Sequence, residues 1–163
     1  MNLLRSIRVL GLKSILSSAL TLEKEIYDLY SSLTAELTGI ETPHSLVRIL
    51  DEELGHKSLI RDMIDGRISD RELEKTIKGE NLHIHHPEAI EALPEERYGR
   101  LRSRLEMILE KEREIYALFA ALHRKSKIPF ARRTFGFLEE QEHVHVQVLE
   151  RLLGRSGGPD DSS

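Results

Sequence analysis

The sequence predicts an all-α fold, a four-helix bundle made of two helical hairpins joined by one long crossover. Three observations predict it. Apolar residues recur at helical spacing through four long segments. Leu, Glu and Arg are the most frequent of the 163 residues, whereas Gly (10) and Pro (5) are sparse, which favours helix. A unit of two helices also occurs twice along the chain.

The first hairpin is expected in the N-terminal part of the chain. Its first helix runs from about Leu10 to about Leu37. Thr42 followed by Pro43 is typical of an N-cap and a first-turn proline, and predicts the start of the second helix. That helix is expected to end at Gly66, because glycine commonly terminates helices.

The crossover is expected at residues 67–93. Ser69 and Glu72 within it have the spacing of a capping box, in which each residue binds a free N–H of the other at a helix start. They predict a short helix there. A connection of this length between two hairpins is typical of one way of closing a four-helix bundle.

The second hairpin is expected to begin at Pro94, which opens the third helix. This helix ends in a cationic turn at Lys125, a composition that suits a helix C-terminus. The fourth helix follows a short loop through Pro129 and ends at Gly154. Residues 155–163 are expected to form a disordered tail, because they are mostly Gly, Ser and Asp.

The two hairpins are copies of one unit. An offset of 89 residues aligns Leu20–Tyr30 with Leu109–Phe119, and the same offset aligns Glu53–His56 with Glu142–His145. Because one offset serves both hairpins, we interpret the chain as a duplicated pair of helices.

Each predicted helix carries a glutamate in the middle of its apolar face. The faces follow from the i, i+3, i+4, i+7 spacing of apolar residues. The second and fourth helices add a histidine three residues after the glutamate, on the same face and one turn further on. The six residues are Glu23, Glu53, His56, Glu112, Glu142 and His145.

Four inward-facing carboxylates need positive charge between them. Burying an unpaired carboxylate is expensive for a domain that is stable by only about 5–15 kcal/mol. Two divalent cations balance four carboxylates, and each Glu-x-x-His pair can hold one cation. The chain has no cysteine, so thiolate metal sites, rubredoxin-type iron centres, disulfides and cysteine nucleophiles are excluded. The sequence therefore predicts a two-metal site with oxygen and nitrogen ligands.

In these features the chain resembles the ferritin-like superfamily, most closely its rubrerythrin and symerythrin branch. The likeness includes a ligand glutamate followed seven residues later by an aromatic residue, and it covers both hairpins. Glu23 precedes Tyr30, and Glu112 precedes Phe119 in this way. The chain departs from the family at Ile115, where rubrerythrins usually carry a further glutamate, and it has no rubredoxin domain.

The resemblance implies a non-haem di-iron oxidoreductase that reduces O₂ or hydrogen peroxide, as a peroxidase or a ferroxidase. Two iron ions are the expected cofactors, although manganese, a mixed Mn/Fe pair or zinc can use the same ligands. The electron donor is expected to be a separate protein, and the chain is expected to form a homodimer. Two alternatives are a ferritin-like shell subunit for iron storage or detoxification, and a metal-free helical interaction protein.

The sequence indicates a role at the metal site less strongly for several further polar residues. Tyr30 is expected near the site, either as a hydrogen-bond donor to a ligand carboxylate or as a radical site, and Tyr27 and Tyr116 are expected to be core aromatics. Glu25 and Glu114 repeat with the same offset but point about 200° away from the ligands, so a solvated or intersubunit position is expected.

Two further sets of residues that contain histidine leave alternatives open. On the fourth helix, Glu140 and His143 form a second Glu-x-x-His pair, an alternative to Glu142 and His145, but this pair is out of register with the apolar face. The crossover residues His83, His85 and His86 fit an exposed loop, with a metal-uptake or pH-sensitive patch as the alternative.

The remaining composition limits the partners and the compartment. The net charge of -4 gives none of the basic excess that nucleic-acid binding requires. Residues 1–10 are apolar and basic, but the chain has no uncharged stretch long enough to cross a membrane. We expect a cytoplasmic protein whose residues 1–154 form the bundle. The N-terminal arm is expected to pack on a partner subunit or to lie on a membrane surface.

Overall fold

A computed structural model of the chain describes residues 3–37, 42–81 and 91–155, without the side chains of residues 3–10, 79–81, 95–97 and 100. The described residues form five helices and no strand. The helices are α1 (Leu3–Glu36), α2 (His44–Asp65), α3 (Asp70–Asn81), α4 (Glu95–Lys125) and α5 (Pro129–Leu152). The predicted all-α fold is therefore confirmed.

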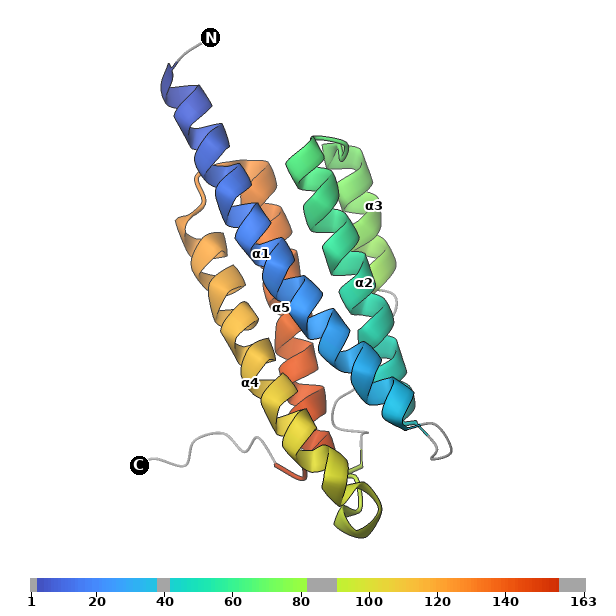
Figure 1. Ribbon diagram of the computed structural model, residues 1–163. Coiled ribbons are helices and arrows are strands. Elements are labelled where there is room, and N and C mark those ends of the chain that lie inside the picture. The colour runs from blue at the N-terminus through green and yellow to red at the C-terminus, as the bar shows by residue number, and fades with distance from the viewer. Residues whose placement is uncertain (1–2, 38–41, 82–90, 156–163) are drawn as a thin grey trace, which may run out of the picture.

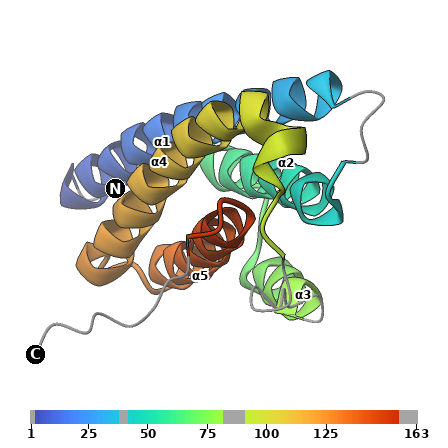
Figure 2. The same ribbon diagram turned by 90° about the horizontal axis from the view of Figure 1, so that it is seen from below.

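Four of the helices form the bundle, and α3 lies outside it. Helices α1 and α2 run antiparallel as one hairpin and α4 and α5 as the other (Figure 1). The two hairpins meet chiefly along α1 and α4, with a smaller contact between α2 and α5. Seen from below, α3 lies on the side of α2 and α5 that is away from α1 and α4 (Figure 2). Arg133 of α5 forms ion pairs with Asp70 and Glu74 of α3.

The ends of α2 show one confirmed prediction and one error. Gly66 ends the helix in a left-handed conformation (φ 66°), and its N–H donates to carbonyl oxygens of the last turn. At the other end, the residue flanking the helix is Pro43 and not Thr42, and no side chain caps the helix. The carbonyl of Pro43 instead accepts from the N–H of Leu46 at 3.0 Å.

The capping box predicted in the crossover is present at the start of α3. Glu72 Oε2 accepts from both the backbone N–H and the hydroxyl of Ser69 at 2.7 Å, and the N–H of Glu72 donates to Ser69 Oγ at 3.3 Å. These hydrogen bonds lower the pKa of Glu72. The histidines His83, His85 and His86 lie outside the described residues.

The first helix begins earlier than the sequence analysis placed it, at Leu3 instead of about Leu10. Its N-terminal end extends past the other helices of the bundle (Figure 1). No helix within the described ranges combines the length and the apolar composition needed to cross a membrane. At the other end of the chain, Arg155 still contacts the bundle through Glu106 Oε1 at 2.8 Å, and residues 156–163 lie outside the described residues.

The core is a continuous column of aliphatic and aromatic side chains between the four long helices. Each long helix packs into this core with its apolar face, so the six polar residues predicted on those faces are buried in the interior. Tyr30, Phe119 and Phe135 are among the largest fully buried side chains.

Candidate metal centre

The structure places all six predicted ligands in the interior of the bundle. Glu23, Glu53, Glu112, Glu142 and His145 are fully buried, and His56 is 4% exposed. One glutamate comes from each long helix, and the histidines come from α2 and α5. Helical spacing on the apolar faces therefore brings together residues that are up to 122 positions apart, Glu23 and His145.

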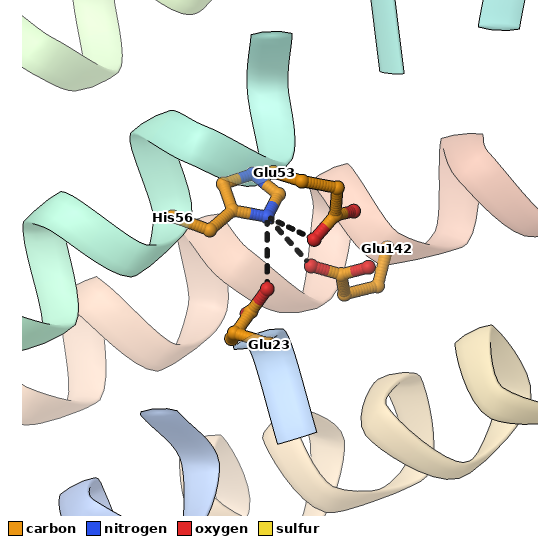
Figure 3. A group of neighbouring side chains, drawn as sticks. All are labelled: Glu23, Glu53, His56 and Glu142. Atoms are coloured by element: carbon orange, nitrogen blue, oxygen red, sulfur yellow. Dashed lines mark ion pairs between the residues drawn. The ribbon is translucent and has the colours of Figure 1, made fainter. Parts of the chain in front are cut away.

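The six residues form two groups that share two carboxylates. Glu23, Glu53, His56 and Glu142 make the first group, and Glu53, Glu112, Glu142 and His145 make the second. In each group one oxygen or nitrogen atom from every residue lies within 4.8 Å of the others. Figure 3 shows the first group, with the side chains of all four residues pointing toward one another. We name the two groups the His56 position and the His145 position.

The distances within the His56 position match those between ligands of one ion. His56 Nδ1 lies 2.8 Å from Glu142 Oε1, 3.8 Å from Glu23 Oε2 and 3.9 Å from Glu53 Oε2 (Figure 3). Two ligand atoms that are each about 2.1 Å from a metal and about 90° apart are about 3.0 Å from each other, and wider angles give longer separations.

The His145 position repeats this arrangement. His145 Nδ1 lies 2.8 Å from Glu53 Oε1, 3.3 Å from Glu142 Oε2 and 3.7 Å from Glu112 Oε1. The two imidazole rings stack with their centroids 5.5 Å apart. Each histidine therefore comes closest to a glutamate of the other hairpin, His56 to Glu142 and His145 to Glu53.

Most of the buried polar atoms of the cluster make no hydrogen bond, although Nδ1 of each histidine lies 2.8 Å from a carboxylate oxygen. Among the described residues, every buried side-chain polar atom without such a partner belongs to these six residues, apart from one nitrogen of Arg48. Unpaired polar atoms are rarely buried, because each one costs about 1–3 kcal/mol. Carboxylate oxygens and imidazole nitrogens that face chiefly one another in one interior space fit divalent metal ions.

Without metal the cluster has to distribute protons among its members. Burial raises the pKa of Glu23 and Glu112 well above the usual carboxyl range, and the charge of Glu53 raises both further. Burial also opposes ionisation of Glu142, but the charge of His56 and the contact with His145 outweigh it and lower the pKa of Glu142. A carboxylate at Glu142 thus lies between two imidazole rings.

For the two histidines, burial and the neighbouring carboxylates act on the pKa in opposite directions. Burial by itself lowers the pKa of His145 and of His56. The facing carboxylates outweigh burial, so the pKa of each imidazole is raised, that of His145 well above 6.5. Protons held by Glu23, Glu112 and the imidazoles must leave when a metal binds.

Metal binding should therefore release protons and should strengthen as the pH rises through the raised pKa values of Glu23, Glu112 and the two imidazoles. The metal-free protein should lose stability as the pH rises, because a group with a raised pKa stabilises the fold only while protonated. This loss begins above pH 4.5 for Glu23 and Glu112 and above pH 6.5 for His145. Calorimetric Mn(II) titrations in buffers of different ionisation enthalpy measure the protons released.

A matched pair of variants tests the origin of those protons. Glu23→Gln should reduce the number released, whereas Glu25→Gln, at an exposed residue two positions along α1, should leave it unchanged. Binding without proton release would contradict the protonation described here.

Tyr30 reaches the cluster from α1. Its hydroxyl donates a hydrogen bond to Glu112 Oε1 at 2.6 Å, and both residues are fully buried. Burial raises the pKa of Tyr30, and the charge of Glu112 raises it further, so the proton stays on the phenol oxygen. The hydrogen bond to a carboxylate of the cluster, one of two expected roles, is present in the structure.

Tyr27 and Tyr116 were expected to be core aromatics, and the structure places neither in the core. Tyr27 and Tyr116 are only half-buried. The ammonium of Lys57 lies 3.8 Å from the ring centroid of Tyr27, and the ring of Tyr116 lies against His143. These positions are at the edges of the apolar faces, where an aromatic ring can bury one side and leave the other in water.

The structure leaves the competing polar residues outside the cluster. Glu140 and His143 are exposed on α5. Glu25 and Glu114 are also exposed, and both lie near Lys111, at 3.9 and 3.3 Å from its ammonium.

Two residues near the cluster were not found by sequence reasoning. Glu52 Oε2 lies 3.0 Å from Nε2 of His145, and the guanidinium of Arg48 donates to Glu52 Oε1 at 3.1 Å. In the sequence Arg48 and Glu52 are an i, i+4 pair, which is ordinarily a surface feature of little consequence. Only the position of α5 beside α2 reveals that this pair faces a histidine.

The chain is similar to one known protein family over most of its length. The family model described as Rubrerythrin matches residues 14–153, which includes both hairpins and all six residues of the cluster. No curated protein and no solved structure matches the chain. Because the match covers most of the sequence, the chain belongs to the rubrerythrin family.

Proposed function

We propose that this protein is a non-haem di-iron oxidoreductase that reduces hydrogen peroxide or O₂. The observation that carries the proposal is the pair of adjacent ligand groups, each with one imidazole and three carboxylates, that share Glu53 and Glu142. Shared carboxylates hold two metal ions close together, which suits a two-electron reaction at one place.

The donor set supports iron as the metal. Glu23 and His56 would hold one ion and Glu112 and His145 the other, and Glu53 and Glu142 belong to both ligand groups. Imidazole and carboxylate ligands suit Fe, and they also accept Mn or Zn. A di-iron pair, when bound, supplies the two electrons that convert hydrogen peroxide, with two protons, into two molecules of water.

Burial of the cluster limits the substrate. Five of the six ligands are fully buried and His56 is 4% exposed, so a bulky organic substrate has no direct contact with them. The proposal therefore takes small oxidants, hydrogen peroxide or O₂, as the substrates. The surrounding apolar side chains exclude bulk water, and Tyr30 orients Glu112 through its hydroxyl.

The chain itself carries no second redox group of the cysteine-ligated kind, because it has no cysteine. The proposal therefore includes a separate electron-donor protein. A homodimer remains the prediction for the oligomeric state.

Single-turnover oxidation tests the proposed activity. The Fe(II)-loaded protein is mixed without O₂ with one equivalent of hydrogen peroxide per chain, and ferric absorbance is followed in a stopped-flow instrument. We expect both irons of a chain to be oxidised by one peroxide. A parallel mixing with O₂ identifies the preferred oxidant.

A matched pair of α5 variants controls this measurement. Glu140→Gln, at an exposed position two residues from the ligand, should behave as the unmodified chain, and Glu142→Gln should oxidise added Fe(II) no faster than Fe(II) free in solution. Oxidation by the unmodified chain no faster than that of free Fe(II) would remove the proposed activity. Light scattering on the same sample distinguishes the alternative, because a large shell with a mineral core indicates iron storage.

A further inference from the structure

The six ligands of the cluster follow the internal repeat closely. The offset of 89 residues relates Glu23 to Glu112, Glu53 to Glu142 and His56 to His145. Ile26 and Ile115, three residues after the first pair, are also equivalent and are both buried. By their ligands alone, the His56 position and the His145 position are chemically alike.

The side chain that contacts the outer nitrogen of His145 does not follow the repeat. Glu52 lies 3.0 Å from Nε2 of His145 and is itself paired with Arg48. The same offset from Glu52 and Arg48 leads to Gln141 and Phe137. A glutamine amide has no charge and a phenyl ring has no polar atom, so α5 offers His56 no equivalent of the charged Glu52–Arg48 pair that α2 presents to His145.

The contact at Tyr30 also lacks a counterpart. Its hydroxyl occupies Glu112 Oε1 and leaves only Oε2 without a hydrogen-bond partner. Phe119 is the equivalent residue and has no hydroxyl to donate. Both oxygens of Glu23 are accordingly buried without a partner.

Both of these unrepeated contacts reach the same position. Glu112 and His145 are the two residues that belong to the second group alone. A carboxylate on the outer nitrogen fixes the imidazole with its proton on Nε2, which leaves the Nδ1 lone pair for a metal and makes it a stronger donor. A hydrogen bond on Glu112 holds that carboxylate in one orientation.

We propose that the two metal positions are inequivalent, with the His145 position binding its ion first and more tightly and the His56 position holding the more readily exchanged ion. The inference rests on the proposed two-metal function and assigns Glu52 and Tyr30 as positioning residues. Loss of an outer partner of a metal ligand typically costs about 10–100-fold in affinity, so the two binding steps should differ by a factor of that order.

A titration of the metal-free chain with Mn(II), followed by electron paramagnetic resonance, tests the inference without measuring activity. The signal of isolated bound Mn(II) should rise to one equivalent per chain and then fall as the second ion couples to the first. Two steps of equal affinity would overturn the inequivalence and leave the two-metal centre intact. Failure to bind any ion would overturn both.

Three variants locate the cause. Glu52→Gln should weaken the first step by about 10–100-fold and leave the second unchanged, and Gln141→Glu should strengthen the second step. Glu139→Gln is the matched control. Glu139 also contacts a histidine nitrogen, that of His123 at 2.7 Å, but neither residue belongs to the cluster.

The pattern of effects separates positioning from general damage. Equal weakening of both steps by Glu52→Gln, or weakening of the first step by Glu139→Gln, would overturn the assignment of Glu52. Melting of the metal-free variants, followed by circular dichroism, checks that each remains folded. For Tyr30→Phe, we expect faster exchange of the tightly bound Mn(II) after addition of excess Zn(II), and an unchanged exchange rate would overturn the role of Tyr30.

Discussion

Removal of the metal ions should lower the unfolding temperature of this protein by about 15–30 °C. An ion at a free concentration about 1,000 times its Kd stabilises the folded state by about 4 kcal/mol, and two ions by about 8 kcal/mol. For a chain of this size each kcal/mol changes the unfolding temperature by about 2–4 °C. Differential scanning calorimetry with excess Mn(II) or Fe(II), and after exhaustive chelation, measures the difference.

The physical reason for this large effect is the charge of the cluster. Four carboxylates and two imidazoles occupy the interior, and nearly all their inward-facing atoms lack hydrogen-bond partners. Metal ions satisfy these atoms at once, and no such compensation exists in the unfolded chain. A difference of only a few degrees between the loaded and chelated forms would favour the metal-free interaction protein.

Glu142→Gln should abolish binding of both ions, whereas Glu23→Gln should abolish or weaken only one. Glu142 belongs to both ligand groups, and Glu23 belongs only to the His56 position. Replacing one carboxylate oxygen with an amide nitrogen removes a charge and a ligand atom. Elemental analysis after loading and desalting should give about two ions per unmodified chain, one for Glu23→Gln and none for Glu142→Gln.

Glu142→Gln also changes the metal-free protein in a way that must be separated from the loss of ligands. The carboxylate of Glu142 lies 2.8 Å from one imidazole and 3.3 Å from the other, and removing one partner of a buried charge pair typically costs about 3–5 kcal/mol. Circular dichroism at low temperature shows whether the variant is folded before its metal content is measured. Two tightly bound ions in folded Glu142→Gln would contradict the shared role of this residue.

Sequence and structure agree best where helical periodicity alone decides the outcome. Glu23, Glu53, Glu112 and Glu142 occupy buried positions of apolar faces, so their inward direction followed from spacing. Local hydrogen bonding explains the agreement at Ser69 and Gly66 in the same way, since a capping box and a glycine terminus involve only neighbours in the chain. The start of α1, by contrast, lies at Leu3 and was placed about seven residues too late.

Helical periodicity and local hydrogen bonding do not predict the contacts between the two hairpins. Nothing in the spacing of α2 indicates that His56 approaches Glu142 more closely than Glu53, at 2.8 and 3.9 Å. The role of Glu52 was equally hidden, because its partner His145 lies 93 residues away on another helix.

The sequence by itself determined the helices, the internal repeat and the six polar residues that enter the core, because each depends on periodicity or on neighbours within a turn. The tertiary structure alone decided which carboxylates are shared, which ring nitrogens face them and which outer side chains, Glu52 and Tyr30, reach only one position. These features depend on the height and rotation of each helix relative to the others. Packing of the whole core sets those quantities, and no local pattern encodes them.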